Sequence, residues 1–327
     1  MGLITTDSQN YINIANAIRS KTGTTSTFLP SEMASAISSI STEGGGGSAD
    51  YLDARAALSG SYYSTASTIG TGAFACARLL NYASLPNLLS IPQSAFMNCD
   101  NLKQIYAPNV SSIGQGAFSH CGGLEYASFP LCTTVYDGFY YCTRMSFASF
   151  PILTQVSGFS NCSSMTTFYA PLAVSVATYG FYNDRALTSV TLSSCCILGQ
   201  YAFYYCSSLS EINLPMVYRG VGSNAFASCS SLSTVKIGSS ATSTSTSQVI
   251  YSSAFTYCRN LLSLYLYNST VWSLSNINAF NSTPISTYTT STGGVHGSIF
   301  VPASLVDTYK SATNWATYSD RIASIPA

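Results

Sequence analysis

Charged side chains are scarce in this chain of 327 residues. They make up 7% of it, whereas about a quarter is usual for a soluble domain. The formal net charge is zero, and lysine and arginine form no cluster. Nucleic acids and anionic membrane surfaces are bound through concentrated positive charge, so the composition argues against both as partners.

Long apolar segments are also missing. The sequence has no run of about 18 apolar residues, which a membrane-spanning helix requires. Its first residues lack a basic region followed by an apolar one, so we expect no signal peptide. The 11 cysteines are an odd number, and without a signal peptide they favour reduced thiols over a disulfide framework.

Sequence motifs of catalysis are absent as well. None of the patterns G-x-S-x-G, GxxxxGK[ST], H-E-x-x-H or C-x-x-C occurs. The carboxylates Glu125, Asp137 and Asp184 fall at different repeat phases, and His120 lies far from His296. We therefore predict that the chain is not an enzyme and has no catalytic residues, no metal site and no cofactor.

The sequence does contain an internal repeat. Its segments align on a phenylalanine, and most steps between successive phenylalanines are 20 to 23 residues. The aligned residues are Phe74, Phe96, Phe118, Phe139, Phe159, Phe181, Phe203, Phe226, Phe255 and Phe280. A cysteine stands three positions later in seven segments, at Cys99, Cys121, Cys142, Cys162, Cys206, Cys229 and Cys258.

A short strand-like stretch follows each cysteine. Examples are "LKQIYAP", "LEYASFP" and "LSEINLP", in which alternate residues such as Ile105 and Ala107 would point inward. Proline often ends the stretch, since it cannot donate to a parallel ladder. Repeats of this length predict a solenoid, in which successive coils stack because one coil cannot bury its apolar face alone.

The predicted fold is therefore a solenoid of about ten coils. A parallel β-sheet would form one face, with turns and short helical segments on the other. Phenylalanine, cysteine and leucine would form internal columns, so Cys121 is expected in the core and His120 on a surface turn. Asp184 replaces cysteine in its column. A carboxylate buried there would need a partner, for which Arg185 is adjacent; alternatively, a local turn would place the side chain outside the core.

The F-x-x-C-x-x-L-x-x-I-x-L-P unit resembles the BspA-type leucine-rich repeat, a family of bacterial and phage surface proteins. The resemblance covers about residues 62 to 300. The segment "YINIANAIRSKTGTTSTFLPSEMASAISSI" resembles a short module at the start of tail-associated proteins in phages of gut Gram-positive bacteria. These resemblances imply a helical attachment module over 1–40, a Gly-rich linker over 41–50, the solenoid over 51–297 and a capping segment over 298–327.

Both ends of the chain have their own expected structure. Two short helices are predicted in residues 1–40, and their apolar stripes would pack on each other, on other copies of the chain or on a partner. In the capping segment we expect a last strand at Ser298 to Val301 and a helix near Pro302 to Ala312. This segment would cover the open end of the core, which would otherwise expose apolar columns and a sheet edge.

Outward-facing positions of the predicted strands are rich in tyrosine, serine, threonine and asparagine, as antibody paratopes are. Such a face suits sugar rings or a protein, although its aromatic side chains could instead only stabilise the sheet. The candidate ligand-binding residues are Tyr82, Tyr106, Tyr126, Phe147, Tyr169, Glu211, Lys236 and Tyr265. A second candidate row lies on the turn side, at Tyr140, Tyr141, Tyr182, Tyr204, Tyr205 and Tyr257.

Together these features favour a phage virion protein of the tail fibre or tail tip. It would be made in the host cytoplasm, attach to other tail proteins through residues 1–40, and recognise a host cell-surface glycan or protein through the solenoid. The alternative is a bacterial cell-surface or secreted leucine-rich-repeat adhesin, which would be extracellular. The sequence leaves a homo-oligomer open.

Overall fold

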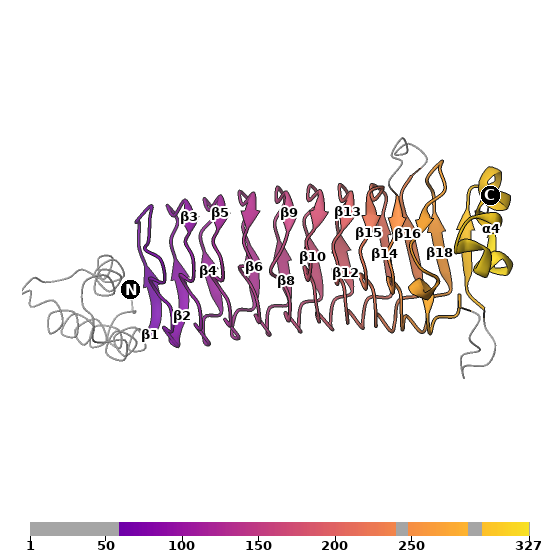
Figure 1. Cartoon of the computed structure of the whole chain (residues 1–327). Coiled ribbons are helices and arrows are strands. Elements are labelled where there is room, and N and C mark those ends of the chain that lie inside the picture. The colour runs from indigo at the N-terminus through magenta and orange to yellow at the C-terminus, as the bar shows by residue number, and fades with distance from the viewer. Residues whose placement is uncertain (1–58, 240–247, 287–295, 327) are drawn as a thin grey trace, which may run out of the picture. The chain divides into compact units, whose positions relative to one another are not determined.

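The structure of this protein is a computed structural model that describes residues 59–239, 248–286 and 296–326. The predicted helical module (1–40) and linker (41–50) lie outside these residues. The chain divides into two compact units, one that ends at Pro151 and one that begins at Ile152. In each unit, parallel strands from successive coils of the chain lie side by side (Figure 1).

The first unit contains longer and shorter parallel strands. The longer strands β1, β2 and β4 pair in that order, and β6 pairs with β8. The shorter strands β3, β5 and β7 form a separate sheet. The bounds are β1 Ser59–Tyr63, β2 Leu79–Ser84, β3 Ser90–Ile91, β4 Gln104–Tyr106, β5 Ser112–Ile113, β6 Tyr126–Ser128, β7 Thr134–Val135 and β8 Phe147–Ser149.

The second unit repeats this arrangement. Strand β10 pairs with β12, and β14, β16, β18, β20 and β21 pair in that order. Their bounds are β10 Thr167–Tyr169, β12 Ser189–Thr191, β14 Glu211–Leu214, β16 Thr234–Ile237, β18 Ser263–Leu266, β20 Ser298–Val301 and β21 Ile322–Ser324. The shorter strands are β9 Gln155–Val156, β11 Ser175–Val176, β13 Ile197–Leu198, β15 Gly220–Val221, β17 Val249–Ile250 and β19 Ser273–Leu274.

The predicted fold class, a leucine-rich-repeat solenoid with parallel strands, is confirmed. The expected turns are present in each coil, and the structure adds two-residue strands, which form a further parallel sheet in each unit. Each short strand supplies one buried side chain, as Ile113 does in β5. A single buried residue leaves no alternating pattern from which a strand is predicted.

The core is built from columns of like residues. In the first unit the rings of Phe74, Phe96, Phe118 and Phe139 stack at centroid distances of 4.9, 5.3 and 5.0 Å, with interplanar angles of 12° or less. In the second unit the column from Phe181 to Phe280 stacks at 5.0 to 5.4 Å. These rings are almost fully buried, so each coil completes the apolar surface that its neighbour leaves open.

The cysteine column links the coils by hydrogen bonds. The thiol of Cys99 donates to the carbonyl oxygen of Phe74 in the preceding coil at 3.0 Å. The same bond recurs in the first unit from Cys121 and Cys142 to Phe96 and Phe118, and in the second unit from Cys206, Cys229 and Cys258 to Phe181, Phe203 and Phe226. Cysteine suits the column because it is a small apolar residue that also carries a weak donor.

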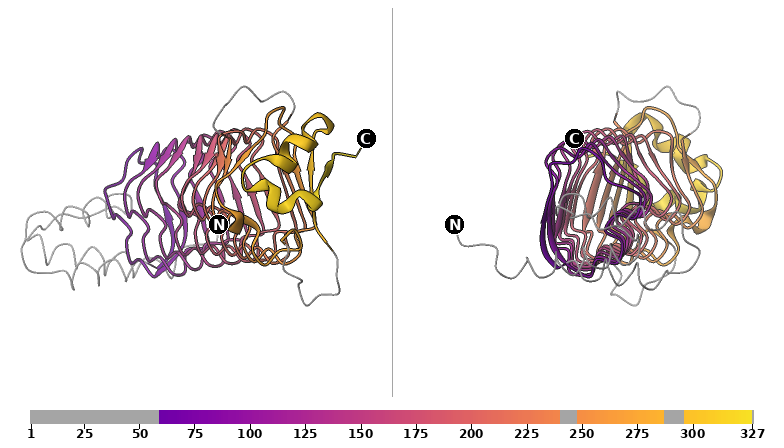
Figure 2. Two further views of the ribbon diagram at one scale, coloured as in Figure 1. Left: turned by 45° about the vertical axis from the view of Figure 1, so that its right-hand side comes forward. Right: turned by 90° about the vertical axis from the view of Figure 1, so that its left-hand side faces the viewer.

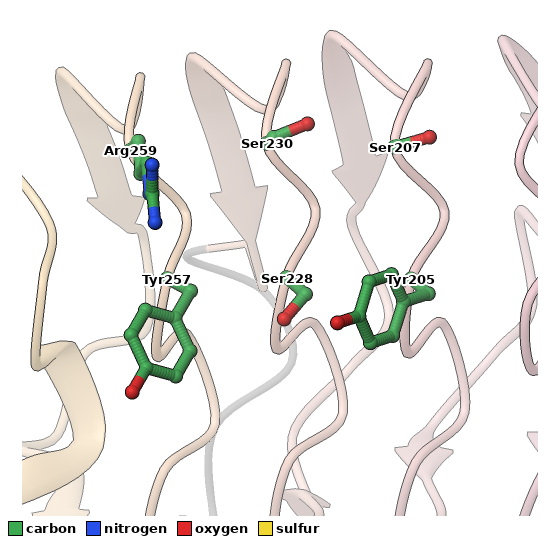
Figure 3. Close-up of a pocket in the computed structure, with 6 residues that line it drawn as sticks. All are labelled: Tyr205, Ser207, Ser228, Ser230, Tyr257 and Arg259. Carbon is green, nitrogen blue, oxygen red and sulfur yellow. The ribbon is translucent and has the colours of Figure 1, made fainter.

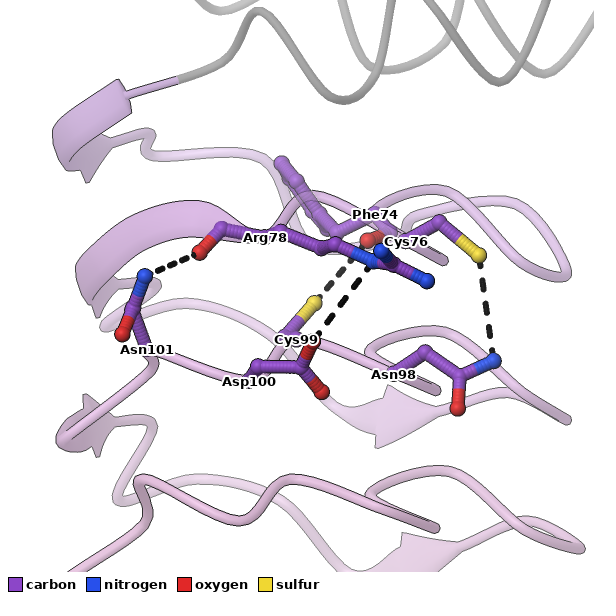
Figure 4. Close-up of polar contacts among 7 residues, drawn as sticks. All are labelled: Phe74, Cys76, Arg78, Asn98, Cys99, Asp100 and Asn101. Atoms are coloured by element: carbon purple, nitrogen blue, oxygen red, sulfur yellow. Dashed lines mark hydrogen bonds and ion pairs between the residues drawn. The ribbon is translucent and has the colours of Figure 1, made fainter.

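Polar side chains outside the core join the same coils. Figure 4 shows three contacts around the Cys99 bond. The Asn98 amide donates to the sulfur of Cys76 at 3.8 Å, and the Asn101 amide donates to the carbonyl of Arg78 at 2.7 Å. The guanidinium of Arg78 also pairs with the exposed Asp100 at 3.5 Å. Exposed pairs of this kind add little stability, so the buried columns carry most of it.

Asp184 lies fully buried in the cysteine column of the second unit. It has a partner, as a buried carboxylate was expected to need, but the partner is not Arg185, and no local turn places the side chain outside. The Arg185 side chain is exposed and donates from Nε to Asn183, while Asp184 Oδ1 accepts the backbone N–H of Cys162 at 2.7 Å. Its other oxygen, Oδ2, has no hydrogen-bond partner among the described residues.

Burial raises the pKa of the Asp184 carboxyl well above its usual value, although the bond from Cys162 acts in the opposite direction. The physical reason is that a carboxylate loses its hydration in the apolar core, so the neutral acid is favoured. The acid can occupy a cysteine position because it is small and, when protonated, carries a donor as a thiol does.

The C-terminal segment closes the second unit (Figure 2). Strand β20 has the bounds predicted for the strand of the capping segment, and the 3₁₀ helix η2 (Ala303–Leu305) and helix α4 (Val306–Ser311) follow it. It is not the last strand, because β21 follows and pairs with it. The Tyr309 hydroxyl accepts the backbone N–H of Trp272 at 2.9 Å, and the Trp315 indole donates to the Trp272 carbonyl at 2.6 Å. In the 3₁₀ helix η3 (Trp315–Arg321), the Tyr318 hydroxyl donates to the carbonyl of Ile277 in the 3₁₀ helix η1 (Ile277–Phe280).

We expect the column cysteines to resist thiol reagents in the folded protein. Cys99, Cys206 and Cys258 are fully buried, and burial raises their pKa values, so the reactive thiolate is both inaccessible and scarce. The partly exposed Cys76 and Cys196 should react first. Mass spectrometry after maleimide labelling, with and without denaturant, identifies the sites. Free labelling of the three column thiols before unfolding would contradict the core described above.

Replacing Asp184 by asparagine should stabilise the protein at neutral pH. The folded protein holds the carboxyl proton more tightly than the unfolded chain does, so this site's contribution is complete below the ordinary aspartate pKa and is lost as pH rises toward the raised value. The advantage of Asp184→Asn should therefore grow by about 1.4 kcal/mol per pH unit above about pH 4, until the raised pKa is reached.

Denaturant unfolding from pH 4 to 8 measures this difference. The matched control is Asp100→Asn at an exposed ion pair, where we expect a change within about 1 kcal/mol at every pH. An Asp184→Asn variant whose advantage stays constant over this range would show that the buried carboxyl does not titrate as the structure requires.

Candidate functional site

The outer face of the longer strands in the first unit carries four of the predicted site residues. Tyr82 lies on β2, Tyr106 on β4, Tyr126 on β6 and Phe147 on β8. Tyr106 is 49% exposed and Phe147 39% exposed, whereas the residues that alternate with them are buried. The period of two along each strand therefore places these rings outside and the aliphatic residues inside, as predicted.

These four side chains form an aromatic surface on the strands of this unit. Tyr126 and Phe147 occupy directly opposite positions on β6 and β8. The ring of Tyr82 lies 5.7 Å from that of Tyr63 on β1, at an angle of 51°. Burial raises the pKa of Tyr126, and the neighbouring Tyr82 and Glu125 raise it further. Its hydroxyl therefore stays neutral at physiological pH and can both donate and accept hydrogen bonds.

The same face of the second unit holds the other four predicted residues. Tyr169 on β10 is 40% exposed, and Glu211 on β14 is exposed. Lys236 on β16 stands opposite Tyr265 on β18, with its ammonium nitrogen 5.9 Å from the ring centroid. Tyr265 stacks in turn on Phe300 of β20 at 4.7 Å.

A depression of about 300 Å³ lies on this face of the second unit. Of the eight predicted site residues, it brings together Glu211 and Lys236, whereas Tyr169 and Tyr265 do not line it. Its lining comes from β12, β14 and β16 and their flanking residues: Thr188, Ser189, Val190, Glu211, Ile212, Asn213, Thr234 and Lys236. Hydroxyl groups and one charge of each sign suit hydrogen bonding to a polar ligand better than burial of an apolar one.

The turn side of the coils also carries aromatic residues, as predicted. In the second unit the ring of Tyr182 stacks on that of Tyr204 at a centroid distance of 5.1 Å. Burial raises the pKa of Tyr204, and the neighbouring tyrosines raise it further. The sequence prediction missed Tyr179 and Tyr201, which stack beside them at 5.1 Å. Their signal was present, because both precede a repeat phenylalanine by two positions.

The described residues show no metal centre and no membrane-spanning helix. Among residues 59–239, 248–286 and 296–326, no three His, Cys, Asp or Glu side chains gather where they could hold a metal ion. Within the same residues, no helix has both the length and the apolar character needed to cross a bilayer. That the chain is not an enzyme stays a prediction.

The spacing of the coils and the Phe and Cys columns agree with a known repeat. The family profile described as the BspA type leucine rich repeat region, in six copies, matches residues 67–177, 133–247 and 174–293. This chain belongs to that family. A search of curated proteins found no match.

Several solved structures resemble this BspA type repeat protein in fold. A leucine rich cell surface protein from Faecalibacterium prausnitzii A2-165 is 17% identical, with 77% of this chain and 85% of that chain covered at a TM-score of 0.35. A leucine-rich repeat protein from Bacteroides ovatus is 17% identical, with coverages of 79% and 87% and a TM-score of 0.39. The pneumococcal vaccine antigen PcpA is 14% identical, with coverages of 81% and 80% and a TM-score of 0.43.

Proposed function

We propose that this BspA type repeat protein is a recognition protein of the adhesin type. In this proposal it binds a cell-surface glycan or protein through the outer face of its longer strands, and it catalyses no reaction. Family membership supports the role of a binding scaffold, although repeat scaffolds as a class carry many different partners. The partner must therefore be argued from the surface itself.

The single observation that carries the proposal is the exposure of aromatic rings on the outer face of the longer strands, in each unit taken by itself. Tyr106, Phe147 and Tyr169 are each at least 39% exposed, although burial of such a ring would be favourable. Serine or threonine stands in neighbouring coils at the same strand positions, for example Ser84 and Thr191. The fold therefore does not require an aromatic ring at these positions, which supports contact with a partner as its role.

The setting of this recognition has two candidates. Family membership favours a bacterial cell-surface adhesin. The resemblance of residues 11–40 to phage tail-associated proteins favours a virion protein, but this segment lies outside the described residues. Antibody labelling of phage particles and of bacterial cells that carry the gene separates the two settings, since only one of them should be decorated.

Replacing the three exposed rings should weaken binding to cells. The variant Tyr106→Ser, Phe147→Thr and Tyr169→Thr introduces residue types that the repeat already carries at these positions. Ser84 stands opposite Tyr106, Thr191 stands opposite Tyr169, and Thr167 has the repeat position of Phe147 in the next segment. We expect at least a roughly tenfold loss of affinity, because a few aromatic anchors supply most of the energy of an interface. Fluorescently labelled protein, incubated with intact gut bacteria and with cultured intestinal epithelial cells, gives the measurement.

A matched control removes exposed rings elsewhere. Tyr136 and Tyr251 follow the short strands β7 and β17 and are 61% and 46% exposed. Their replacement by serine should leave cell binding unchanged. Undiminished binding by a folded triple variant would exclude the strand face as the recognition surface.

A further inference from the structure

A second surface, on the turn side of the second unit, has the features of a ligand site. One position in each coil, two residues after the repeat phenylalanine, forms a column along the turns. In the second unit this column runs through Asn161, Asn183, Tyr205, Ser228 and Tyr257. Ser228 therefore separates two tyrosines that stand two coils apart.

The first unit shows how aromatic residues behave at adjacent positions of this column. There His120 and Tyr141 occupy successive coils and stack at 4.9 Å, with an interplanar angle of 6°. Aromatic side chains at this position in successive coils are therefore close enough to stack on each other. At Ser228 the column has a short side chain where a third ring would fit, so the surface is open between Tyr205 and Tyr257.

A cavity of about 430 Å³ occupies this place, and we call it the tyrosine slot. Figure 3 shows Ser228 between the two tyrosines, with a second row of side chains that follows the same three coils. The six residues that line the slot are Tyr205, Ser207, Ser228, Ser230, Tyr257 and Arg259. Arg259 is the only charged residue among them, and no carboxylate lines the slot.

The backbone position of the two tyrosines also accepts residues without a ring. Tyr205 and Tyr257 have φ angles of 61° and 63°, in the left-handed region that disfavours a bulky side chain. Asparagine adopts this region more readily, and Asn161 and Asn183 hold the same position with φ angles of 62° and 63°. The left-handed conformation belongs to the turn of the repeat, since His120, Tyr141 and Ser228 share it, and an aromatic ring is not needed to form it.

The two rings are open to a ligand. Tyr205 is 42% exposed and Tyr257 is 50% exposed. The guanidinium carbon of Arg185, from the preceding coil, lies 5.9 Å from the centroid of the Tyr205 ring, so one side of this ring is already covered by a cation. The slot lies toward the following coils, where Ser228, Ser230 and Arg259 are found.

The composition of the slot matches an acidic sugar chain. Aromatic rings bind the apolar faces of pyranose rings, and serine hydroxyls hydrogen-bond to the sugar hydroxyls. A guanidinium forms paired hydrogen bonds with a carboxylate. Successive coils are about 4.8 Å apart, which is close to the length of one pyranose residue in an extended β-linked chain. A chain parallel to the column would place alternate sugars at Tyr205 and Tyr257, with one sugar over Ser228.

We propose that the tyrosine slot binds a β-linked chain of uronic acid residues. Tyr205 and Tyr257 bind two sugars by stacking, Ser228 leaves room for the sugar between them, and Arg259 binds a carboxylate. A peptide with an aromatic side chain is less suited to the slot, because it would not use the second row of polar side chains, Ser207, Ser230 and Arg259, along all three coils. The site is separate from the strand face and does not depend on the function proposed for that face.

Calorimetric titration of the full-length protein with two sugars tests this site. The probes are a β-linked oligomannuronate and the neutral oligomannoside of the same linkage and length, which differ only in the carboxylate. We expect the acidic sugar to bind at least tenfold more tightly. Arg259→Gln should abolish this preference and leave both sugars with the weaker affinity.

Two kinds of variant test the tyrosines without disturbing the fold. Tyr205→Asn and Tyr257→Asn place the residue type of Asn161 and Asn183 in the same backbone conformation, so thermal stability should stay equal or rise. Each should lower the affinity for oligomannuronate at least tenfold. The matched control is Tyr141→Asn in the first unit, which removes an exposed tyrosine at the same position of the repeat and should not change binding.

Filling the slot gives an independent test. Ser228→Tyr should complete the column with a third ring and abolish binding while the protein remains folded. The proposal is overturned if the wild-type protein does not bind oligomannuronate, or if folded Tyr205→Asn, Tyr257→Asn and Ser228→Tyr variants bind it as well as wild type. If the strand-face triple variant loses cell binding but still binds oligomannuronate, the two sites bind their ligands independently of each other.

Discussion

The fold depends on the contact between one coil and the next through the phenylalanine and cysteine columns. A single coil has only a few apolar residues and cannot bury them by itself. When one coil stacks on the next, the phenylalanine rings bury each other's apolar faces. The same contact lets a cysteine thiol donate a hydrogen bond to the phenylalanine carbonyl oxygen of the preceding coil. The side chains of the outer face lie outside these columns, and their type varies from coil to coil.

Much of this arrangement follows from the sequence. The spacing of the phenylalanines and cysteines predicts the columns, and the alternation in "LKQIYAP" places Ile105 inside and Tyr106 outside, as found. The eight predicted site residues lie on the longer strands for the same reason. Periodicity is thus sufficient to decide which side of a strand a residue occupies, and that the residues bind a partner stays a prediction.

Other features could not be predicted, for identifiable reasons. The short strands contain two residues each, so they carry no periodic signal. The partner of Asp184 is a backbone N–H one coil away, which no side-chain pattern reveals. The tyrosine slot depends on the absence of a ring at Ser228, and its meaning appears only when the neighbouring coils are placed beside it. A repeat pattern predicts which residues form a column, but it does not show that a small residue such as Ser228 opens a cavity between two of them.

The closing segment at the C-terminus has a consequence for how such a protein can change in length. Tyr309, Trp315 and Tyr318 contact main-chain groups of residues 272 to 277 through hydrogen bonds specific to that final coil. A duplicated or deleted repeat is therefore compatible with this ending only if it arises further upstream and leaves the final coil intact. Insertion between the coils of Tyr205 and Tyr257 would preserve the architecture yet alter the distance between the two rings, so gene duplication could adjust ligand preference without redesign of either end.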